Sequence, residues 1–249
     1  MRIVLLWGLL ALLTTGPAHA LTVAAASSLR LVMPELEEAF REQSPETDIR
    51  VIFGASGKLA TQIVNGAPYD VFLSADTAYT EQLVRLGSAA SDPEVYAVGR
   101  LVLWHADPQR EALTPADLGG ESIRRIAIAQ PRHAPYGQRA QEALQSLGLW
   151  QDLREKLVYG ENIGQTAAMV ESGAADAGLI AWSLTFAPEL AGRPFTLIDG
   201  DLHEPLAMAM VVTRRGADQP EAHRFRDFLQ SAEAGAILRR YGFESPDRE

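Results

Sequence analysis

The sequence predicts an α/β protein of two domains, each a mostly parallel sheet flanked by helices. Short apolar runs alternate with segments of helical period, which is typical of strands joined by crossover helices. The 249 residues are enough to bury two cores. A late apolar run at 206–212 has no helix of its own before it and can return the chain to the first domain. We therefore predict domain I at 21–99 and 206–249, and domain II at 100–205.

The first 20 residues resemble a secretory signal peptide. Arg2 precedes an apolar stretch at 4–13, and Ala18 and Ala20 then form an Ala-x-Ala cleavage site. The stretch is much shorter than the about 20 apolar residues that a membrane anchor needs. We expect cleavage before Leu21 and release of the protein into a bacterial periplasm.

Composition narrows the possible functions. The formal net charge of −10 argues against a nucleic-acid partner. The absence of cysteine excludes disulfides and thiolate chemistry. No other apolar run is long enough to span a bilayer, so we expect a soluble exported protein.

In domain I, strands and helices are expected to alternate from the first mature residue. The expected strands are 21–26, 48–53 and 70–74, and the expected helices are 29–40, 58–65 and 77–86. The first helix has an apolar stripe at helical spacing that includes Leu29, Leu36 and Phe40. Such alternation implies a parallel sheet covered on both faces.

In domain II, an apolar segment at 96–104 leads into a second set of elements. The expected strands are 126–129 and 177–181, and the expected helices are 137–147, 150–156 and 165–171. Two further helices, 221–230 and 234–241, are expected after the run at 206–212. Two segments that cross between the domains would form a hinge, and a ligand would bind in the cleft between the two domains.

The clearest functional signal is a strand–turn–helix stretch at 51–64. Gly54 and Gly57 allow a tight turn, and Ser56 is expected to offer its hydroxyl at the helix N-cap. Backbone amides at a helix N-terminus attract anions. The same pattern recurs at 23–29, 130–137 and 159–164. These four helix starts predict an anion site made of neutral donors.

Known catalytic and metal-binding motifs are absent from the sequence. The turn is no nucleotide P-loop, because Ile52 stands where that motif has its first glycine, and Gly-Ala-Ser-Gly is no nucleophile elbow. The histidines of the mature chain lack metal-type spacing and are expected to be solvated or capping: His105, His133, His203 and His223.

The remaining charged candidates are also expected to be structural. Asp70 and Asp76 flank a strand without a base or nucleophile and are expected to be capping residues. Lys58 is expected to be solvated, and Arg132 to be a charge on a surface loop.

Five stretches of the sequence resemble the periplasmic molybdate-binding proteins of molybdate ABC transporters. They are 23–29, 53–63, 66–76, 142–150 and 240–243, and their order and spacing together are specific. The resemblance covers essentially the whole mature chain. It implies a type II periplasmic binding fold, whose two domains close over a tetrahedral oxyanion. It also implies a monomer that delivers its ligand to a membrane permease and needs no cofactor.

The resemblance further implies a ligand set. Molybdate, the only metal species implied, would be held by the side chains of Ser28 and Ser56 and by the backbone amides of Tyr136 and Ile163. Four neighbouring positions are secondary candidates: Ser27, Gly57, Gly137 and Ala181. Some relatives place a tyrosine hydroxyl where this chain has Ala181. That donor is missing here, so a water or another neighbour must replace it.

The donor loops also restrict the anion. They contain no carboxylate, and the nearest in sequence is Glu161. Hydrogen phosphate needs an acceptor for its proton, so a fully ionised dianion is expected. Sulfate remains an alternative to molybdate and tungstate, which the resemblance favours. Two other classes of protein are less favoured. A hydrolase on the same fold would need a nucleophile with a neighbouring base, and the sequence offers none. The sensing domain of a regulator would need a helix-turn-helix segment before it, where this sequence has an export signal.

Overall fold

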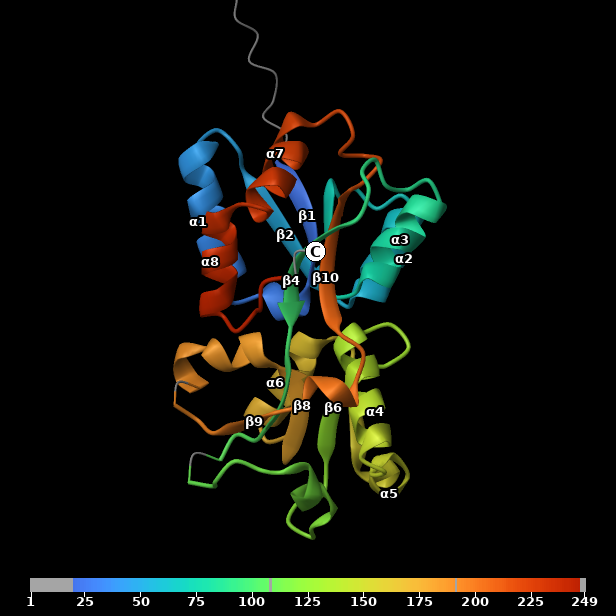
Figure 1. Ribbon diagram of the computed structural model, residues 1–249, viewed down its shortest axis with the longest axis vertical. Helices are drawn as coiled ribbons and strands as arrows, with labels where there is room; N and C mark the ends of the chain where they lie inside the picture. The colour runs from blue at the N-terminus through green and yellow to red at the C-terminus, as the bar shows by residue number, and fades with distance from the viewer. Residues whose placement is uncertain (1–19, 108, 191, 247–249) are drawn as a thin grey trace, which may run out of the picture.

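The computed structural model describes residues 20–107, 109–190 and 192–246, which form two lobes stacked along the long axis of the molecule (Figure 1). The predicted signal peptide, 1–20, lies outside the described residues except for Ala20. Within the described ranges, no helix has the length and apolar character needed to cross a membrane.

Lobe 1 is built on a five-stranded sheet with the order β2-β1-β3-β10-β4. The strands are β1 (Leu21–Ala26), β2 (Ile49–Gly54), β3 (Val71–Ser74), β4 (Glu94–Gly99) and β10 (Leu206–Val212). β1 runs parallel to β2 and β3, and β10 runs antiparallel to β3 and β4. The late apolar run therefore returns the chain to the first sheet.

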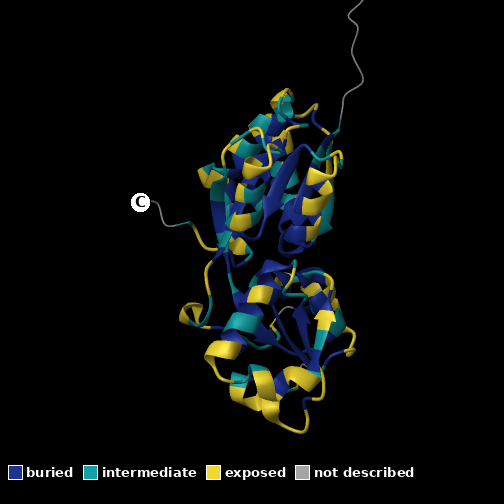
Figure 2. Cartoon of the chain, turned by 90° about the vertical axis from the view of Figure 1, so that its right-hand side faces the viewer, coloured by how far each residue is buried: buried dark blue, intermediate teal, exposed yellow. Residues whose placement is uncertain are grey.

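Helices cover both faces of this sheet. They are α1 (Met33–Gln43), α2 (Ser56–Val64), α3 (Thr77–Arg85), α7 (Pro220–Leu229) and α8 (Ala232–Arg240). Side chains alternate along β1, so that Val23 and Ala25 belong to one core while Ala24 packs in the core beneath α2 and α3. Figure 2 shows buried strands inside a more exposed layer of helices.

Lobe 2 contains a second five-stranded sheet, with the order β7-β6-β8-β5-β9. Its strands are β5 (Leu101–Trp104), β6 (Ile126–Ala129), β7 (Leu157–Gly160), β8 (Ala177–Ala181) and β9 (Phe195–Leu197). Its α-helices are α4 (Pro135–Ser146), α5 (Trp150–Leu153) and α6 (Ile163–Glu171). Short 3-10 helices occupy 27–29, 115–119, 154–156, 182–186, 188–190 and 200–202.

The α/β fold class is confirmed, and several element predictions need correction. The apolar segment predicted at 96–104 breaks at Arg100, because β4 and β5 belong to different sheets. The first helix begins at Met33 rather than Leu29, after a 3-10 turn. Neither β7 nor β9 was predicted as a strand.

The chain passes between the two sheets twice. The first passage is at Arg100, between β4 and β5, and the second is at 198–205, between β9 and β10. We propose that the domains are 21–99 with 206–249 and 100–205, an assignment that this topology supports. The two passages would then form the hinge.

Candidate anion-binding site

A small cavity lies where the two lobes meet. Its volume is about 10 Å³, so the walls lie close together. Ten residues line it: Ala26, Ser27, Gly54, Ala55, Ser56, Ala75, Ala134, Pro135, Tyr136 and Ile163. They come from the carboxyl ends of strands in lobe 1 and from helix starts in both lobes. The lining includes no side chain that is charged at neutral pH.

Three of the helix starts at this cavity follow an alanine. Ala26, Ala55 and Ala134 are the N-cap residues of the first 3-10 helix, α2 and α4, and none makes a side-chain cap. Elsewhere, Asp76 and Ser231 cap α3 and α8 with side-chain oxygens. Because the first amides of a helix have no partner within it, an alanine N-cap leaves them available to another group.

The two predicted amide donors are placed on the cavity wall. Tyr136 is the second residue of α4 and Ile163 the first residue of α6, so both amides lie in a first helical turn. In α6, the Asn162 side chain accepts a hydrogen bond from the amide of Gln165 at 3.0 Å. The Asn162 side chain therefore binds the amide of Gln165 and does not occupy the amide of Ile163.

Ser56 lines the cavity with a hydroxyl whose hydrogen-bonding role is partly fixed. Only 1% of the residue is exposed, and its Oγ accepts a hydrogen bond from the Ala75 amide at 3.0 Å. Because that bond uses a lone pair of the oxygen, the hydroxyl proton remains available to donate. The prediction of Ser56 as N-cap is wrong by one residue: Ala55 is the N-cap and Ser56 begins α2.

The two adjacent serines after β1 differ in their positions. Ser27 lines the cavity, and its Oγ donates to the Gly54 carbonyl at 3.1 Å. Ser28 is fully buried and is not among the lining residues. Neither Ser28 Oγ nor the Tyr136 hydroxyl has a hydrogen-bond partner in the described part of the chain. Burial raises the pKa of the Tyr136 phenol, and the neighbouring Ser28 hydroxyl opposes that shift.

The two candidate glycines already use their amides in the protein. The Gly57 amide donates to the His133 carbonyl at 2.9 Å, and the Gly137 amide donates to the Ala134 carbonyl at 2.9 Å. A Cβ built on Gly137 would lie 2.0 Å from the Ala129 carbonyl oxygen. Gly137 therefore allows α4 to begin close against β6.

Ala181 ends β8 and is fully buried, away from the cavity lining. Its methyl group cannot donate a hydrogen bond. The nearby Ser183 hydroxyl donates to the Ser28 carbonyl at 2.7 Å, so its proton is already engaged. Neither residue therefore supplies the donor that some relatives provide at this position.

Comparison with known proteins gives the family of this chain. The family model for bacterial extracellular solute-binding proteins matches residues 21–244. The molybdate-binding protein ModA of Rhodobacter capsulatus is 38% identical over 230 residues, which cover 91% of this chain and 90% of that protein. The chain belongs to the ModA family of solute-binding proteins. ModA of Azotobacter vinelandii is 34% identical over 246 residues, 97% of this chain and 96% of that protein.

The fold agrees with a solved structure of this family. The periplasmic molybdate-binding protein of Azotobacter vinelandii matches with a TM-score of 0.85 at 33% identity, covering 91% of this chain and 100% of that one. The relatives of the present chain from Rhodobacter and Azotobacter are named as binding proteins rather than enzymes.

One ion pair of this ModA family member involves the carboxylate that is nearest in sequence to the donor loops. The carboxylate of Glu161 forms an ion pair with Lys58, which reaches it from the other lobe. Lys58 is exposed, as predicted, and its ammonium also has this ion-pair partner. Arg132 is exposed, as predicted.

The two aspartates that flank β3 have different roles. Asp76 caps α3 as predicted, and its Oδ1 accepts from the Ala78 amide at 2.8 Å. The prediction of a cap at Asp70 is wrong. Asp70 instead accepts from the Thr22 amide at 2.8 Å and pairs with Arg215 at 3.3 Å. Asp70 therefore joins β1 to the loop that precedes β3.

The histidines contact backbone oxygens. His105 is only 1% exposed, which contradicts the prediction of a solvated or capping residue, and its Nε2 lies 2.9 Å from the Glu111 carbonyl. His133 Nε2 lies 3.0 Å from the Glu161 carbonyl. Within the described ranges, no group of three or more His, Cys, Asp or Glu side chains could hold a metal ion.

Proposed function

We propose that this protein is the periplasmic receptor of an ABC transporter and binds molybdate or tungstate in the cavity between its lobes. The observation that carries the proposal is the composition of the cavity wall: uncapped helix amides from both lobes and the Ser56 hydroxyl from lobe 1, without a charged side chain. The names of the relatives from Rhodobacter and Azotobacter as molybdate-binding proteins support the choice of anion.

The proposed donors suit a doubly charged tetrahedral oxyanion. Its four oxygens can accept from Ser56 Oγ and from the amides of Tyr136 and Ile163. Ser27 lies on the same wall, and the buried Ser28 follows it in the chain. A hydrogen bond to a charged group contributes about 1.5 to 3 kcal/mol, so a few such bonds account for tight binding. The helix starts add favourable potential for an anion. A wall of neutral donors also avoids leaving unpaired buried cations when the site is empty.

Exchange of the ligand requires the lobes to separate. The lining residues Ser56, Tyr136 and Ile163 are 1%, 2% and 4% exposed, so solvent hardly reaches the cavity in this closed arrangement. Rotation at the two passages between the sheets would open it. The open form would take up the anion and the closed form would carry it to the permease.

The wall also favours one class of anion. Hydrogen phosphate would bring a proton into a cavity without a carboxylate to accept it, at a cost of about 1 to 3 kcal/mol. Sulfate is fully ionised but has shorter bonds than molybdate. In a cavity that fits the larger ion it would reach fewer donors at good distance. We therefore expect similar affinities for molybdate and tungstate, much weaker sulfate binding and no phosphate binding.

Native mass spectrometry of the purified protein, followed by calorimetric titration with the four anions, tests the proposal. The expected results are a bound mass equal to one molybdate or tungstate and displacement of that ion only by the other metal oxyanion. Displacement of micromolar molybdate by millimolar sulfate would indicate a sulfate receptor. Turnover of phosphate or sulfate esters would indicate an enzyme instead.

A further inference from the structure

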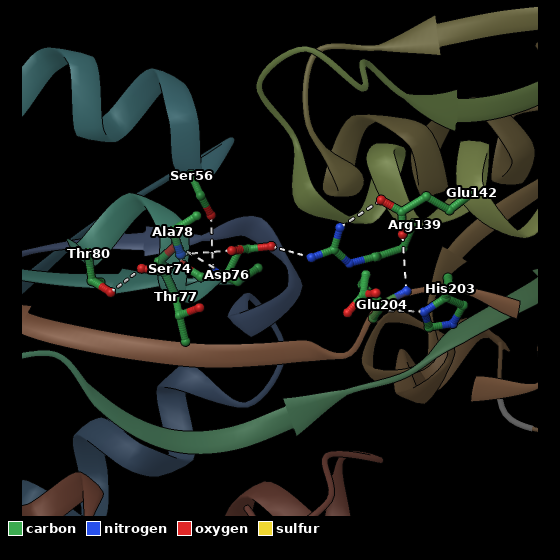
Figure 3. A network of polar contacts seen from close by, with 11 residues as sticks. Ser56, Ser74, Asp76, Thr77, Ala78, Thr80, Arg139, Glu142, His203 and Glu204 are labelled. Carbon is green, nitrogen blue, oxygen red and sulfur yellow. Dashed lines mark hydrogen bonds and ion pairs between the residues drawn. The ribbon is translucent and has the colours of Figure 1, made fainter. Parts of the chain in front are cut away.

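A buried ion pair joins the two lobes beside the cavity. Arg139 of α4 in lobe 2 directs Nη2 to Oδ2 of Asp76, which follows β3 in lobe 1, at 2.5 Å (Figure 3). The two side chains are only 8% and 11% exposed. A second carboxylate, Glu142, accepts from Nη1 of Arg139 at 2.9 Å within lobe 2.

The Asp76 carboxylate is held rigidly in lobe 1. Its other oxygen caps α3, and its backbone amide and carbonyl bond to the Ser74 hydroxyl at 3.1 and 2.7 Å. The preceding residue, Ala75, donates its amide to Ser56 Oγ. Asp76 is thus one residue away from the group that orients a proposed ligand donor.

On the lobe 2 side, the same network reaches a ligand donor and a hinge passage. Arg139 lies one helical turn after Tyr136 on α4, so its position and that of the Tyr136 amide are coupled through one helix. Glu142 Oε2 accepts from the Glu204 amide at 3.1 Å, and Glu204 lies just before β10 in the second passage between the sheets.

Burial distinguishes this pair from the ion pair between Lys58 and Glu161, which also joins the two lobes. Lys58 and Glu161 have side chains 46% and 60% exposed, and such pairs contribute about 0 to 1 kcal/mol. For a buried pair the attraction is largely offset by desolvation, whereas removing one partner leaves an uncompensated charge. Such a pair favours one closed geometry without holding the lobes shut permanently.

We propose that Arg139 and Asp76 are positioning residues that fix the relative position of the two lobes in the closed form, and that the pair thereby controls how fast the anion is released. Closure brings the Tyr136 amide toward the Ser56 hydroxyl, and the ion pair forms only when that alignment is correct. The effect on anion release rests on the proposed function, whereas the effect on lobe closure does not.

Stopped-flow dissociation of molybdate from Arg139→Gln, Asp76→Asn and the double variant tests the proposal. Asparagine keeps the cap of α3 while removing the charge. We expect each single variant to speed dissociation at least about tenfold, with association within about threefold of the unchanged protein. The double variant should be no faster than the faster single variant, because both changes break one interaction. Arg139→Lys, which keeps the charge, should restore part of the slow release.

Two further variants serve as matched controls. Glu161→Gln breaks the exposed pair between the lobes, and Arg224→Gln breaks a surface pair within lobe 1, where Arg224 lies 2.7 Å from Glu221. Both should release the anion within about twofold of the normal rate. Dissociation of Arg139→Gln at the same rate as these controls, or additive effects in the double variant, would overturn the proposal. If Arg139→Gln does not fold, Asp76→Asn decides on the same criteria.

A readout without ligand separates this proposal from the proposed function. The sequence has no cysteine, so two introduced at the exposed positions Glu46 and Gln151, one in each lobe, can carry a pair of dyes. Single-molecule energy transfer should show that Asp76→Asn lowers the closed fraction several-fold in the ligand-free protein. An unchanged closed fraction would reject the positioning role, even if the protein binds none of the four anions.

Discussion

Replacing Ser56 by alanine removes a hydroxyl that has two hydrogen-bonding roles. The side chain is buried, its oxygen accepts from the Ala75 amide at 3.0 Å, and its proton is available to the proposed ligand. Loss of a hydrogen bond to a charged ligand should weaken binding by about 1.5 to 3 kcal/mol, roughly 10- to 150-fold. The Ala75 amide would lose its buried acceptor, and this loss should lower the free energy of unfolding of the ligand-free protein by about 1 to 3 kcal/mol.

The two effects can be measured separately and compared with a matched control. Calorimetric titration with molybdate gives the affinity, and denaturant unfolding without anion gives the stability. Thr213→Val removes a hydroxyl that is also buried, accepts from the Gly216 amide at 3.3 Å and donates to the Tyr69 carbonyl at 2.6 Å, away from the cavity. It should lower stability and leave affinity unchanged. If Ser56→Ala behaves like this control, the hydroxyl does not contact the anion and the reasoning fails.

Four other predictions test the site and its surroundings. Tyr136→Phe keeps the backbone amide and should leave molybdate affinity within about twofold; a tenfold loss in titration would show that the phenol is a donor that replaces the one missing from the family pattern. Gly137→Ala would place a Cβ 2.0 Å from a backbone oxygen of β6 and should cost about 1 to 3 kcal/mol of stability in denaturant unfolding. Gly235→Ala on α8, where the new Cβ would make only an ordinary contact with the Arg239 side chain at 3.5 Å, should be neutral or stabilising. Burial and two nearby cations lower the pKa of His133, so the unfolded chain binds this proton more readily. Stability should therefore fall as the pH drops below about 6.5, and His133→Gln should reduce that slope in unfolding measured across pH. Intact mass of the protein recovered from a periplasmic fraction should place its N-terminus at Leu21, and recovery of an uncleaved chain would contradict the signal peptide.

Local sequence patterns were enough to predict most of the α/β framework. Apolar spacing is a property of neighbouring residues, so the strands at 21–26, 126–129 and 177–181 were predicted with their observed bounds. β9 was missed because only three residues form it at the edge of a sheet, too few to establish a period. The break at Arg100 was missed because a continuous apolar run does not reveal that its halves pair with different sheets.

The recurring strand–turn–helix pattern also indicated which loops form the cavity. The predicted positions Ser56, Tyr136 and Ile163 all lie on its wall, since each occurrence of the pattern lies at the start of a helix. Their binding of an anion stays a prediction. A possible signal for these uncapped starts was present in Ala55 and Ala134, because an alanine before a helix leaves its first amides without a cap.

The sequence by itself therefore determined most of the order of the elements, the family and the neutral character of the donor loops, because each of these depends on residue type and short-range spacing. Only the tertiary structure decided that Ser27 rather than Ser28 lines the cavity and that Arg139 meets Asp76. Those contacts join segments far apart in the chain, and their geometry follows from how two sheets pack across a hinge. A charged side chain in a helix gives no local sign of its partner, because burial and pairing arise only when the lobes come together.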